Sequence, residues 1–179
     1  MRLEFPTAPW PTSLKVISAL GTVAVIAIGY AAYQAMPKVT GLAHSFGLVV
    51  AAVPFVLLLW SYALSVRGYA VEGDELQVRR LATVTRVPLA GITRAYPDPG
   101  ICKGSIRVVG NGGLFSYSGI FYNKKIGRFR LFATDFAHSV VLVMPQRVVV
   151  LTPDNPHALI EHLRQRHPGM ALTAAHDAG

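Results

Sequence analysis

The chain has 179 residues, 52% of them hydrophobic, and carries a formal net charge of +8 from 17 Lys and Arg against 9 Asp and Glu. Its single cysteine, Cys102, excludes an internal disulfide and a cysteine-rich metal site. Lys38 is the only charged residue between positions 16 and 66, whereas charges recur regularly after Gly68. The first part of the chain is therefore predicted to lie in lipid and the remainder in water.

Two uncharged stretches follow one another, at residues 16–36 and 42–66. At 1.5 Å per residue, the first would span roughly 30 Å as a helix, the thickness of a bilayer's hydrocarbon core. The second ends near Trp60 and Tyr62, aromatic residues of the kind enriched at membrane interfaces. Only residues 37–41 connect the two stretches, which predicts an antiparallel transmembrane hairpin.

Two other interpretations of these stretches are excluded. A cleaved signal peptide has a shorter apolar run and is not followed at once by a second span. A buried helical hairpin of a soluble protein would need a polar face, and neither stretch has one. Pro54 is expected to kink the second helix, which membrane helices tolerate.

The orientation of the hairpin follows from its basic flanks. The connection between the two spans carries only Lys38, while the residues outside the spans carry more positive charge. Cytoplasmic flanks of membrane spans are enriched in Lys and Arg, so both termini are predicted to be cytoplasmic in a multi-pass protein of the cytoplasmic (inner) membrane. The flanking basic residues are Arg2, Lys15, Arg67, Arg79, Arg80 and Arg86.

After Gly68 the apolar run gives way to short alternating strands. The first two are predicted at residues 69–72 and 75–79, joined by a turn at Gly73-Asp74. Because no helix-length pattern interrupts the strands, antiparallel pairing is favoured. Further strands are predicted at residues 87–92, where Pro88 indicates an edge or bulge, and at 105–109, 129–133, 140–144 and 148–151.

One helix is predicted after the last strand. Asn155 is a good N-cap, Pro156 suits the first helical position, and three apolar residues form one face: Leu159, Ile160 and Leu163. The predicted organisation is a cytoplasmic N-terminal segment at residues 1–15, the transmembrane hairpin at 16–66, a β domain with its C-terminal helix at 67–167, and a disordered tail at 168–179.

About seven short strands closed by one helix match the pleckstrin-homology (PH) architecture. The motifs SIRVVGNGGLF at residues 105–115, GIFYN at 119–123, GRF at 127–129 and ATD at 133–135 resemble bacterial PH-like domains, which often follow two membrane spans. The resemblance covers residues 69–166 and implies a PH-type fold and a membrane location. The predicted fold class is therefore α+β: an N-terminal transmembrane α-hairpin, then an antiparallel β-sandwich or barrel of PH type capped by a C-terminal α-helix.

The run Gly110-Asn111-Gly112-Gly113 is the most conspicuous motif of the β domain. Glycine allows positive φ angles and a close approach of the backbone, and successive N–H groups in such a loop can hold an anion. The spacing matches neither a Walker loop nor a dinucleotide fingerprint. A strand-connecting turn and an anion-binding loop both fit the motif.

Residues 100–134 carry basic side chains interleaved with aromatic ones, without a single Asp or Glu. Each basic residue close to an anionic leaflet contributes about 1 kcal/mol to binding. This stretch is either a solvated basic face set by topology, or a contact surface for anionic lipid headgroups or an acidic partner protein. The candidate lipid- or partner-contact residues are Arg107, Gly110, Asn111, Gly112, Gly113, Lys124, Lys125, Arg128 and Arg130.

No catalytic residue, metal site or cofactor is predicted. The histidines of the last helix are five residues apart, whereas metal ligands on one helix face are four apart. Asp135 and His138 lack a nucleophile, and Cys102 lacks an identifiable base. Nucleic acid is not an expected partner, because the positive charge is scattered along strands and not gathered on a helix.

These observations favour a non-enzymatic, membrane-anchored module that binds or scaffolds at the cytoplasmic membrane surface through its basic face. The hairpin makes the lipid bilayer its first partner and keeps its effective concentration toward neighbouring membrane components high. Anionic lipid headgroups or a membrane protein are the further candidate partners. The alternative is a subunit or assembly factor of a larger membrane protein complex.

Overall fold

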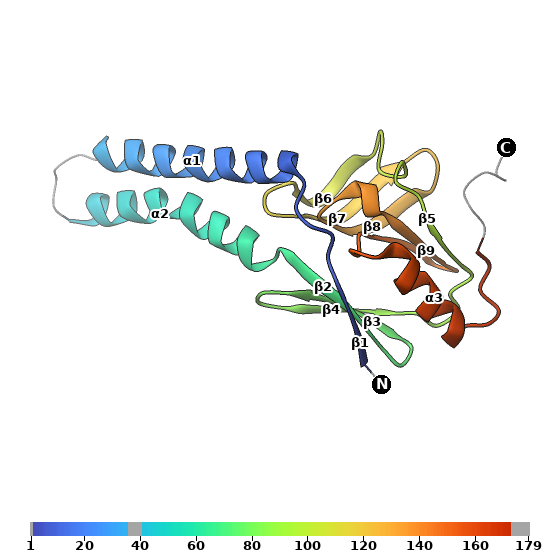
Figure 1. Ribbon diagram of the computed structural model, residues 1–179. Helices are drawn as coiled ribbons and strands as arrows, with labels where there is room; N and C mark the ends of the chain where they lie inside the picture. The colour runs from blue at the N-terminus through green and yellow to red at the C-terminus, as the bar shows by residue number, and fades with distance from the viewer. Residues whose placement is uncertain (1, 36–40, 173–179) are drawn as a thin grey trace.

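The computed structural model describes residues 2–35 and 41–172. Two long helices extend from one end of a β domain (Figure 1). The elements in chain order are β1 (Arg2–Pro6), α1 (Thr12–Gln34), α2 (Leu42–Ala63), β2 (Val66–Glu72), β3 (Glu75–Arg80), β4 (Val84–Pro88), β5 (Arg94–Pro97), β6 (Ile106–Gly112), β7 (Tyr117–Asn123), β8 (Gly127–Ala133), the 3-10 helix η1 (Phe136–His138), β9 (Val140–Met144), β10 (Arg147–Leu151) and α3 (Pro156–Arg166).

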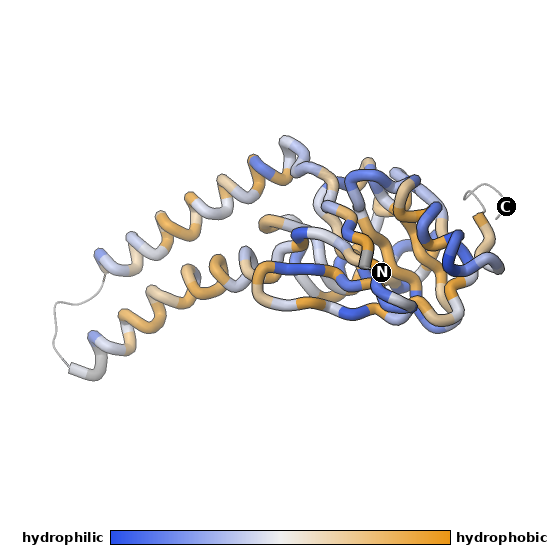
Figure 2. Tube along the Cα trace, turned by 60° about the horizontal axis from the view of Figure 1, so that its bottom comes forward, coloured by the Kyte–Doolittle hydropathy of each residue, from blue (hydrophilic) through white to orange (hydrophobic). Residues whose placement is uncertain are grey.

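Helices α1 and α2 lie side by side and point away from the β domain (Figure 1). Gly29 of α1 is buried against the ring of Phe55 in α2, and a side chain at position 29 would clash with that ring. Both helices are long and apolar enough to cross a membrane, and only 11% and 0% of their most apolar windows are buried within the chain. Figure 2 shows hydrophobic residues along both helices. They are therefore not core helices of the β domain.

Pro54 lies inside α2, and α2 changes direction part-way along its length in Figure 1, in agreement with the predicted kink. Of the predicted connection at residues 37–41, only Gly41 is among the described residues. The last residue of the first predicted span, at position 36, also lies outside them.

The β domain consists of two sheets. The four-stranded sheet has the order β1-β2-β3-β4, and the six-stranded sheet has the order β5-β9-β10-β8-β7-β6. All neighbouring strands are antiparallel except β8 and β10, which run parallel. This pair differs from the predicted antiparallel pairing. The prediction assumed that parallel strands need a long connecting helix, whereas η1 and β9 form the crossover from β8 to β10.

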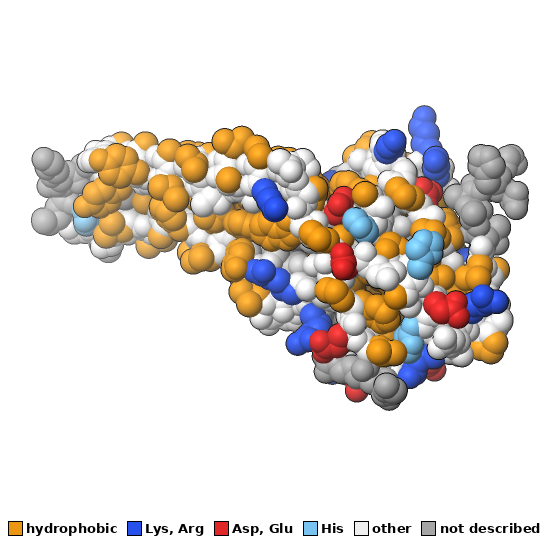
Figure 3. Space-filling model, viewed as in Figure 1, with side chains coloured by type: hydrophobic (Ala, Val, Ile, Leu, Met, Phe, Trp, Pro, Cys, Tyr) orange, Lys and Arg blue, Asp and Glu red, His pale blue; other side chains and the backbone are white. Residues whose placement is uncertain are grey.

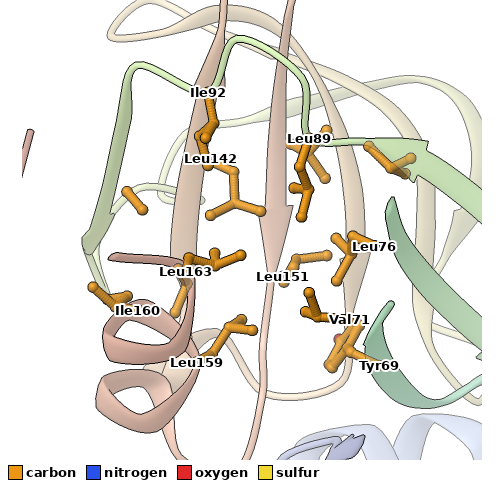
Figure 4. Close-up of a cluster of buried hydrophobic side chains, with 14 of the residues drawn as sticks. Tyr69, Val71, Leu76, Leu89, Ile92, Leu142, Leu151, Leu159, Ile160 and Leu163 are labelled. Atoms are coloured by element: carbon orange, nitrogen blue, oxygen red, sulfur yellow. The ribbon is translucent and has the colours of Figure 1, made fainter. Parts of the chain in front are cut away.

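A hydrophobic core fills the space between the two sheets and beneath α3 (Figure 4). Strands of both sheets contribute fully buried aliphatic side chains, and α3 covers the open side of the core with the apolar face predicted from the sequence. The core includes Val71 and Leu76 from the four-stranded sheet, Leu142 and Leu151 from the six-stranded sheet, and Leu159, Ile160 and Leu163 from α3.

Tyr69 of β2 crosses this core and joins the two sheets. Its side chain is fully buried, and its hydroxyl donates a hydrogen bond to the carbonyl of Phe132 at 2.7 Å. The same oxygen accepts a hydrogen bond from the N–H of Thr152 at 3.2 Å. Burial raises the pKa of Tyr69 to about 12, so the phenol remains a hydrogen-bond donor at neutral pH.

The N-terminal segment contributes a strand that the sequence did not predict. β1 pairs antiparallel with β2, and Glu4 forms an ion pair with Arg79 at 2.7 Å. The next residues also join the β domain: Ala8 donates its N–H to the carbonyl of Thr152 at 2.9 Å and accepts a bond from the hydroxyl of Thr134 at 2.8 Å. The start of α1 is therefore held against the β domain.

Several predicted elements are confirmed. The turn at Gly73-Asp74 joins β2 and β3, the hairpin of β9 and β10 has the predicted position, and the Asn155 side chain caps α3 by accepting a bond from Ala158 N–H at 3.0 Å. The strand predicted at residues 87–92 is displaced, because β4 ends at Pro88. Leu89 and Ile92 are buried in the turn that follows, where Gly91 adopts a φ of 72°.

The segment after α3 is packed for its first few residues. Met170 is buried in the core, and Ala171 donates its N–H to the carbonyl of Thr93 at 2.9 Å. The sequence predicted a disordered tail from position 168. Its last part, residues 173–179, lies outside the described residues.

We expect the Tyr69→Phe substitution to lower the free energy of unfolding by about 1–3 kcal/mol, because it leaves a buried carbonyl and a buried N–H without their partner. Thermal unfolding of the full chain in detergent, followed by circular dichroism, measures the loss. Tyr122→Phe makes the same chemical change on a half-exposed side chain and should have little effect. Equal melting temperatures for the two variants would contradict the role assigned to Tyr69.

Candidate functional site

The loop between β6 and β7 docks onto the ends of α1 and α2 that meet the β domain. Asn111, at the end of β6, donates its amide N–H to the hydroxyl of Ser61 in α2 at 2.9 Å. Its amide oxygen accepts the N–H of Leu114 at 3.1 Å, which closes the loop. The N–H of Phe115 donates to the hydroxyl of Ser18 in α1 at 2.9 Å. One loop therefore binds both helices.

Phe115 fixes this contact through its ring. It has a φ of 65°, a left-handed conformation that is uncommon for a non-glycine residue. The ring packs edge-on against Tyr62 at 5.2 Å between centroids and lies 6.3 Å from the ring of Trp10. Leu114 packs against α1 at Gly21, where an added Cβ would lie 2.9 Å from its side chain. The apolar contacts and the hydrogen bonds thus act on the same four-residue loop.

The glycines of the conspicuous motif allow close backbone approach. Gly110 faces Gly119 across β6 and β7, with φ angles of 126° and 142°. A Cβ on either residue would clash with the backbone of the opposite strand. Gly112 makes room for the guanidinium of Arg107, which a side chain at position 112 would displace. Gly110, Asn111 and Gly112 form the end of β6 and Gly113 begins the loop, so the motif joins the strand to the loop.

A cleft of about 780 Å³ lies beside the docked loop. One wall is the last part of α2, with Leu57, Trp60 and Leu64. The opposite wall is formed by strands β6, β7 and β8, and the end of β3 closes one side. Three arginines line the cleft, one from each of three strands: Arg80 of β3, Arg107 of β6 and Arg130 of β8.

Arg80 and Arg130 share one aromatic ring. Each guanidinium carbon lies over the ring of Phe132, 5.3 Å from its centroid. Burial lowers the pKa of Arg80 from its ordinary value, and the positive charge of Arg130 lowers it further. Arg80 Nε is buried and has no hydrogen-bond partner within the described part of the chain. The cleft therefore holds two like charges that repel one another.

Within residues 2–35 and 41–172, no carboxylate forms an ion pair with the three arginines of the cleft. Arg107 reaches the region from the edge strand β6 and also lines a second cleft of about 350 Å³, together with Cys102 and Tyr117. The site is consequently electropositive on its β-sheet side and apolar on its helix side.

The other predicted contact residues lie farther from the helices. Lys124 and Lys125 are in the turn between β7 and β8, at the opposite end of β7 from the docked loop, and both are exposed. Seven residues of strand separate the two ends by roughly 20 Å. Arg128 is exposed on β8, two positions before Arg130. The fold thus separates the basic residues into two groups, one at the cleft and one at the distal turn.

The sequence did not predict the importance of Arg80, Ser18, Ser61 or Phe132. Arg80 was assigned only to the basic flank of the membrane spans. The two serines lie in apolar stretches with no motif around them, and Phe132 fitted the alternation of a strand. The signal that the two serines share is a polar residue near the end of an apolar stretch, which does not identify its partner in the β domain.

The groups considered for catalysis have structural contacts instead. Asp135 caps η1 by accepting the N–H of Ala137 at 3.0 Å and lies 3.4 Å from His138. Burial raises the pKa of the Cys102 thiol to about 11. In the part of the chain that the structure describes, no group of three or more His, Cys, Asp or Glu could hold a metal ion.

Two long apolar helices, two packed sheets and a closing C-terminal helix define an α+β protein with a PH-type domain on a helical hairpin. A family model described as Bacterial PH domain matches residues 67–167, more than half of the chain, and the protein belongs to that family. Comparisons with curated proteins and with solved structures found no match. The predicted family resemblance and fold class are confirmed.

We expect Cys102 to react about tenfold more slowly with a maleimide at pH 8 than an exposed cysteine. Its raised pKa lowers the thiolate fraction about a hundredfold, and the greater nucleophilicity of a more basic thiolate restores part of the rate. The comparison is a Lys124→Cys variant in a Cys102→Ser background. The rate at Cys102 should keep rising with pH up to about 11. A rate that levels off near pH 8 would contradict the assigned pKa.

Proposed function

We propose that the protein is a non-enzymatic, membrane-anchored PH-like module of the cytoplasmic membrane. In this proposal α1 and α2 span the bilayer, and the β domain binds or scaffolds at the cytoplasmic surface through its basic residues. The observation that carries the proposal is the apolar surface of the two helices, which Figure 3 shows covered with hydrophobic side chains while most charged ones lie on the β domain. Soluble monomers rarely expose more than a few hundred Å² of continuous apolar surface.

The basic residues beside the helices support a contact with anionic headgroups. Arg107 and Arg130 lie next to α2, at the level where the bilayer surface would be. Arg128 lies next along β8, and Lys124 and Lys125 would face the cytoplasm or an acidic partner. In this arrangement Asn111 and the glycines of its loop act by positioning the β domain on the helices, and not by direct contact with a ligand.

We expect the full chain to remain in the membrane pellet after alkaline carbonate extraction. The treatment weakens charge contacts, but transfer of the two apolar helices from lipid to water would cost too much free energy. In a Cys102→Ser background, Lys124→Cys should react with an impermeant maleimide only after cells are permeabilised. Lys38→Cys should react in intact cells. Extraction into the supernatant would contradict the membrane anchor, and the reverse labelling pattern would contradict the cytoplasmic orientation.

A second candidate function is supported by a separate observation. β6 is an edge strand of the six-stranded sheet, and Ile106, Val108 and Val109 are 68%, 53% and 63% exposed. An apolar edge strand with unpaired backbone groups is a template for pairing with another chain. This favours a subunit or assembly factor of a larger membrane complex.

The test of this second function is the Val109→Lys substitution on the edge strand. If a protein partner pairs with β6, the variant should lose a cross-linked species that the unchanged protein forms in solubilised membranes. Val84→Lys makes the same change on the edge strand of the other sheet, where Val84 is 52% exposed, and should retain that species. Loss of the species in both variants, or in neither, would contradict an interface at β6.

A further inference from the structure

The cleft between α2 and strands β6–β8 holds positive charge that no carboxylate in the described part of the chain compensates. The guanidinium groups of Arg80 and Arg130 both lie over the ring of Phe132, and no carboxylate of the described residues pairs with them. Two like charges without a counter-charge raise the free energy of the folded state. An anion beside the two guanidinium groups would remove that repulsion.

The shape of the anion is indicated by its binding groups. The guanidinium group presents a planar fork of N–H donors that matches the oxygens of a phosphate in two parallel hydrogen bonds. Two such forks in one cleft suit the tetrahedral phosphate of a phosphodiester, whose two non-bridging oxygens share the negative charge. Arg107 at the edge supplies a third positive charge.

The other wall of the cleft indicates what is attached to the phosphate. Leu57 and Trp60 of α2 and Leu64 directly after it line the cleft with the arginines, and Leu57 and Trp60 are 61% and 63% exposed. This apolar wall continues along α2 into the surface proposed to lie in the bilayer. Trp side chains favour the headgroup level of membranes. A ligand in this cleft therefore meets positive charge at the surface and hydrocarbon along the helix.

We propose that this cleft binds the phosphate of an anionic phospholipid, with the acyl chain lying along α2 beside Leu57. The site is separate from the distal turn of Lys124 and Lys125, and it deepens the proposed function, on which it rests for the position of the bilayer. The lipid acts as a bridge between helix and sheet, since its phosphate contacts β3 and β8 while its chain contacts α2.

The test uses the full chain in neutral detergent, titrated with phosphatidylglycerol and observed by native mass spectrometry and thermal unfolding. We expect a saturable single-lipid complex and a rise in melting temperature. The double variant Arg80→Gln, Arg130→Gln should weaken lipid binding by at least about tenfold and lose the rise in melting temperature. Arg130→Gln alone, at an exposed side chain, should give an intermediate loss and guards against a misfolded double variant.

The matched control is Lys124→Gln, Lys125→Gln, which removes the same two positive charges at the distal turn. We expect it to bind the lipid within about twofold of the unchanged protein. Equal weakening in both double variants would show attraction by net charge and would overturn the site. Equal affinity in the arginine variant and the unchanged protein would overturn it as well.

Two further arms identify the source of the phosphate. Glycerophosphoglycerol is the same phosphodiester headgroup without acyl chains, and we expect no comparable rise in melting temperature with it. An equal rise would overturn the lipid assignment. The lipid site is also overturned if phosphatidylglycerol binds neither the unchanged protein nor the arginine double variant, and the double variant instead loses an acidic protein partner. If only this inference fails, every variant still remains in the membrane pellet after carbonate extraction. If the proposed membrane anchor fails, every variant is found in the supernatant.

Discussion

The arrangement of this protein depends on the hydrogen bonds that tie the β6–β7 loop to Ser18 and Ser61. Two residues join α2 to β2, and the segment between β1 and α1 is bonded to the β domain through Ala8. The bond from Phe115 to Ser18 and the bond from Asn111 to Ser61 add a third attachment, at the loop between β6 and β7. Three points of attachment define an orientation, so the domain faces the helices with one side only.

That fixed orientation creates the cleft and decides which charges lie beside α2. Because the loop holds the β6–β8 face against the last part of α2, Arg107 and Arg130 line the cleft beside that helix while remaining exposed. Arg80 arrives from the other sheet, and Tyr69 holds the two sheets together one strand away. The electropositive side of the cleft is thus a consequence of packing between three parts of the chain, not of any local run of basic residues.

The sequence predicted those features that have a local cause. Long uncharged stretches indicated α1 and α2, the Gly73-Asp74 turn indicated the first hairpin, and Asn155-Pro156 indicated the start of α3. The strand β1 was missed because five residues carry too little alternation, and β4 was misplaced because buried residues of a turn look like those of a strand. The parallel pairing of β8 with β10 was missed because a strand, and not a helix, forms its crossover.

The candidate site was harder to predict for a physical reason. Arg80 and Arg130 are fifty positions apart and meet only because β3 and β8 belong to different sheets that pack around Phe132. From the sequence, the basic side chains of the stretch 100–134 were predicted to form one face. In the fold, the length of β7 separates Lys124 and Lys125 from the cleft and places them in the distal turn.

The paired glycines connect the local motif to this distant geometry. Gly110 and Gly119 bring the backbones of β6 and β7 closer than any side chain would allow, and both lie beside the cleft. A larger residue at either position would push the hairpin apart just before the loop that binds Ser18 and Ser61. The glycines therefore act through the backbone: they allow the close approach of β6 and β7 beside the cleft and place Asn111 against Ser61 of α2. The Asn111 amide donates to Ser61 and accepts from Leu114, so the motif helps to hold the six-stranded sheet on the helices.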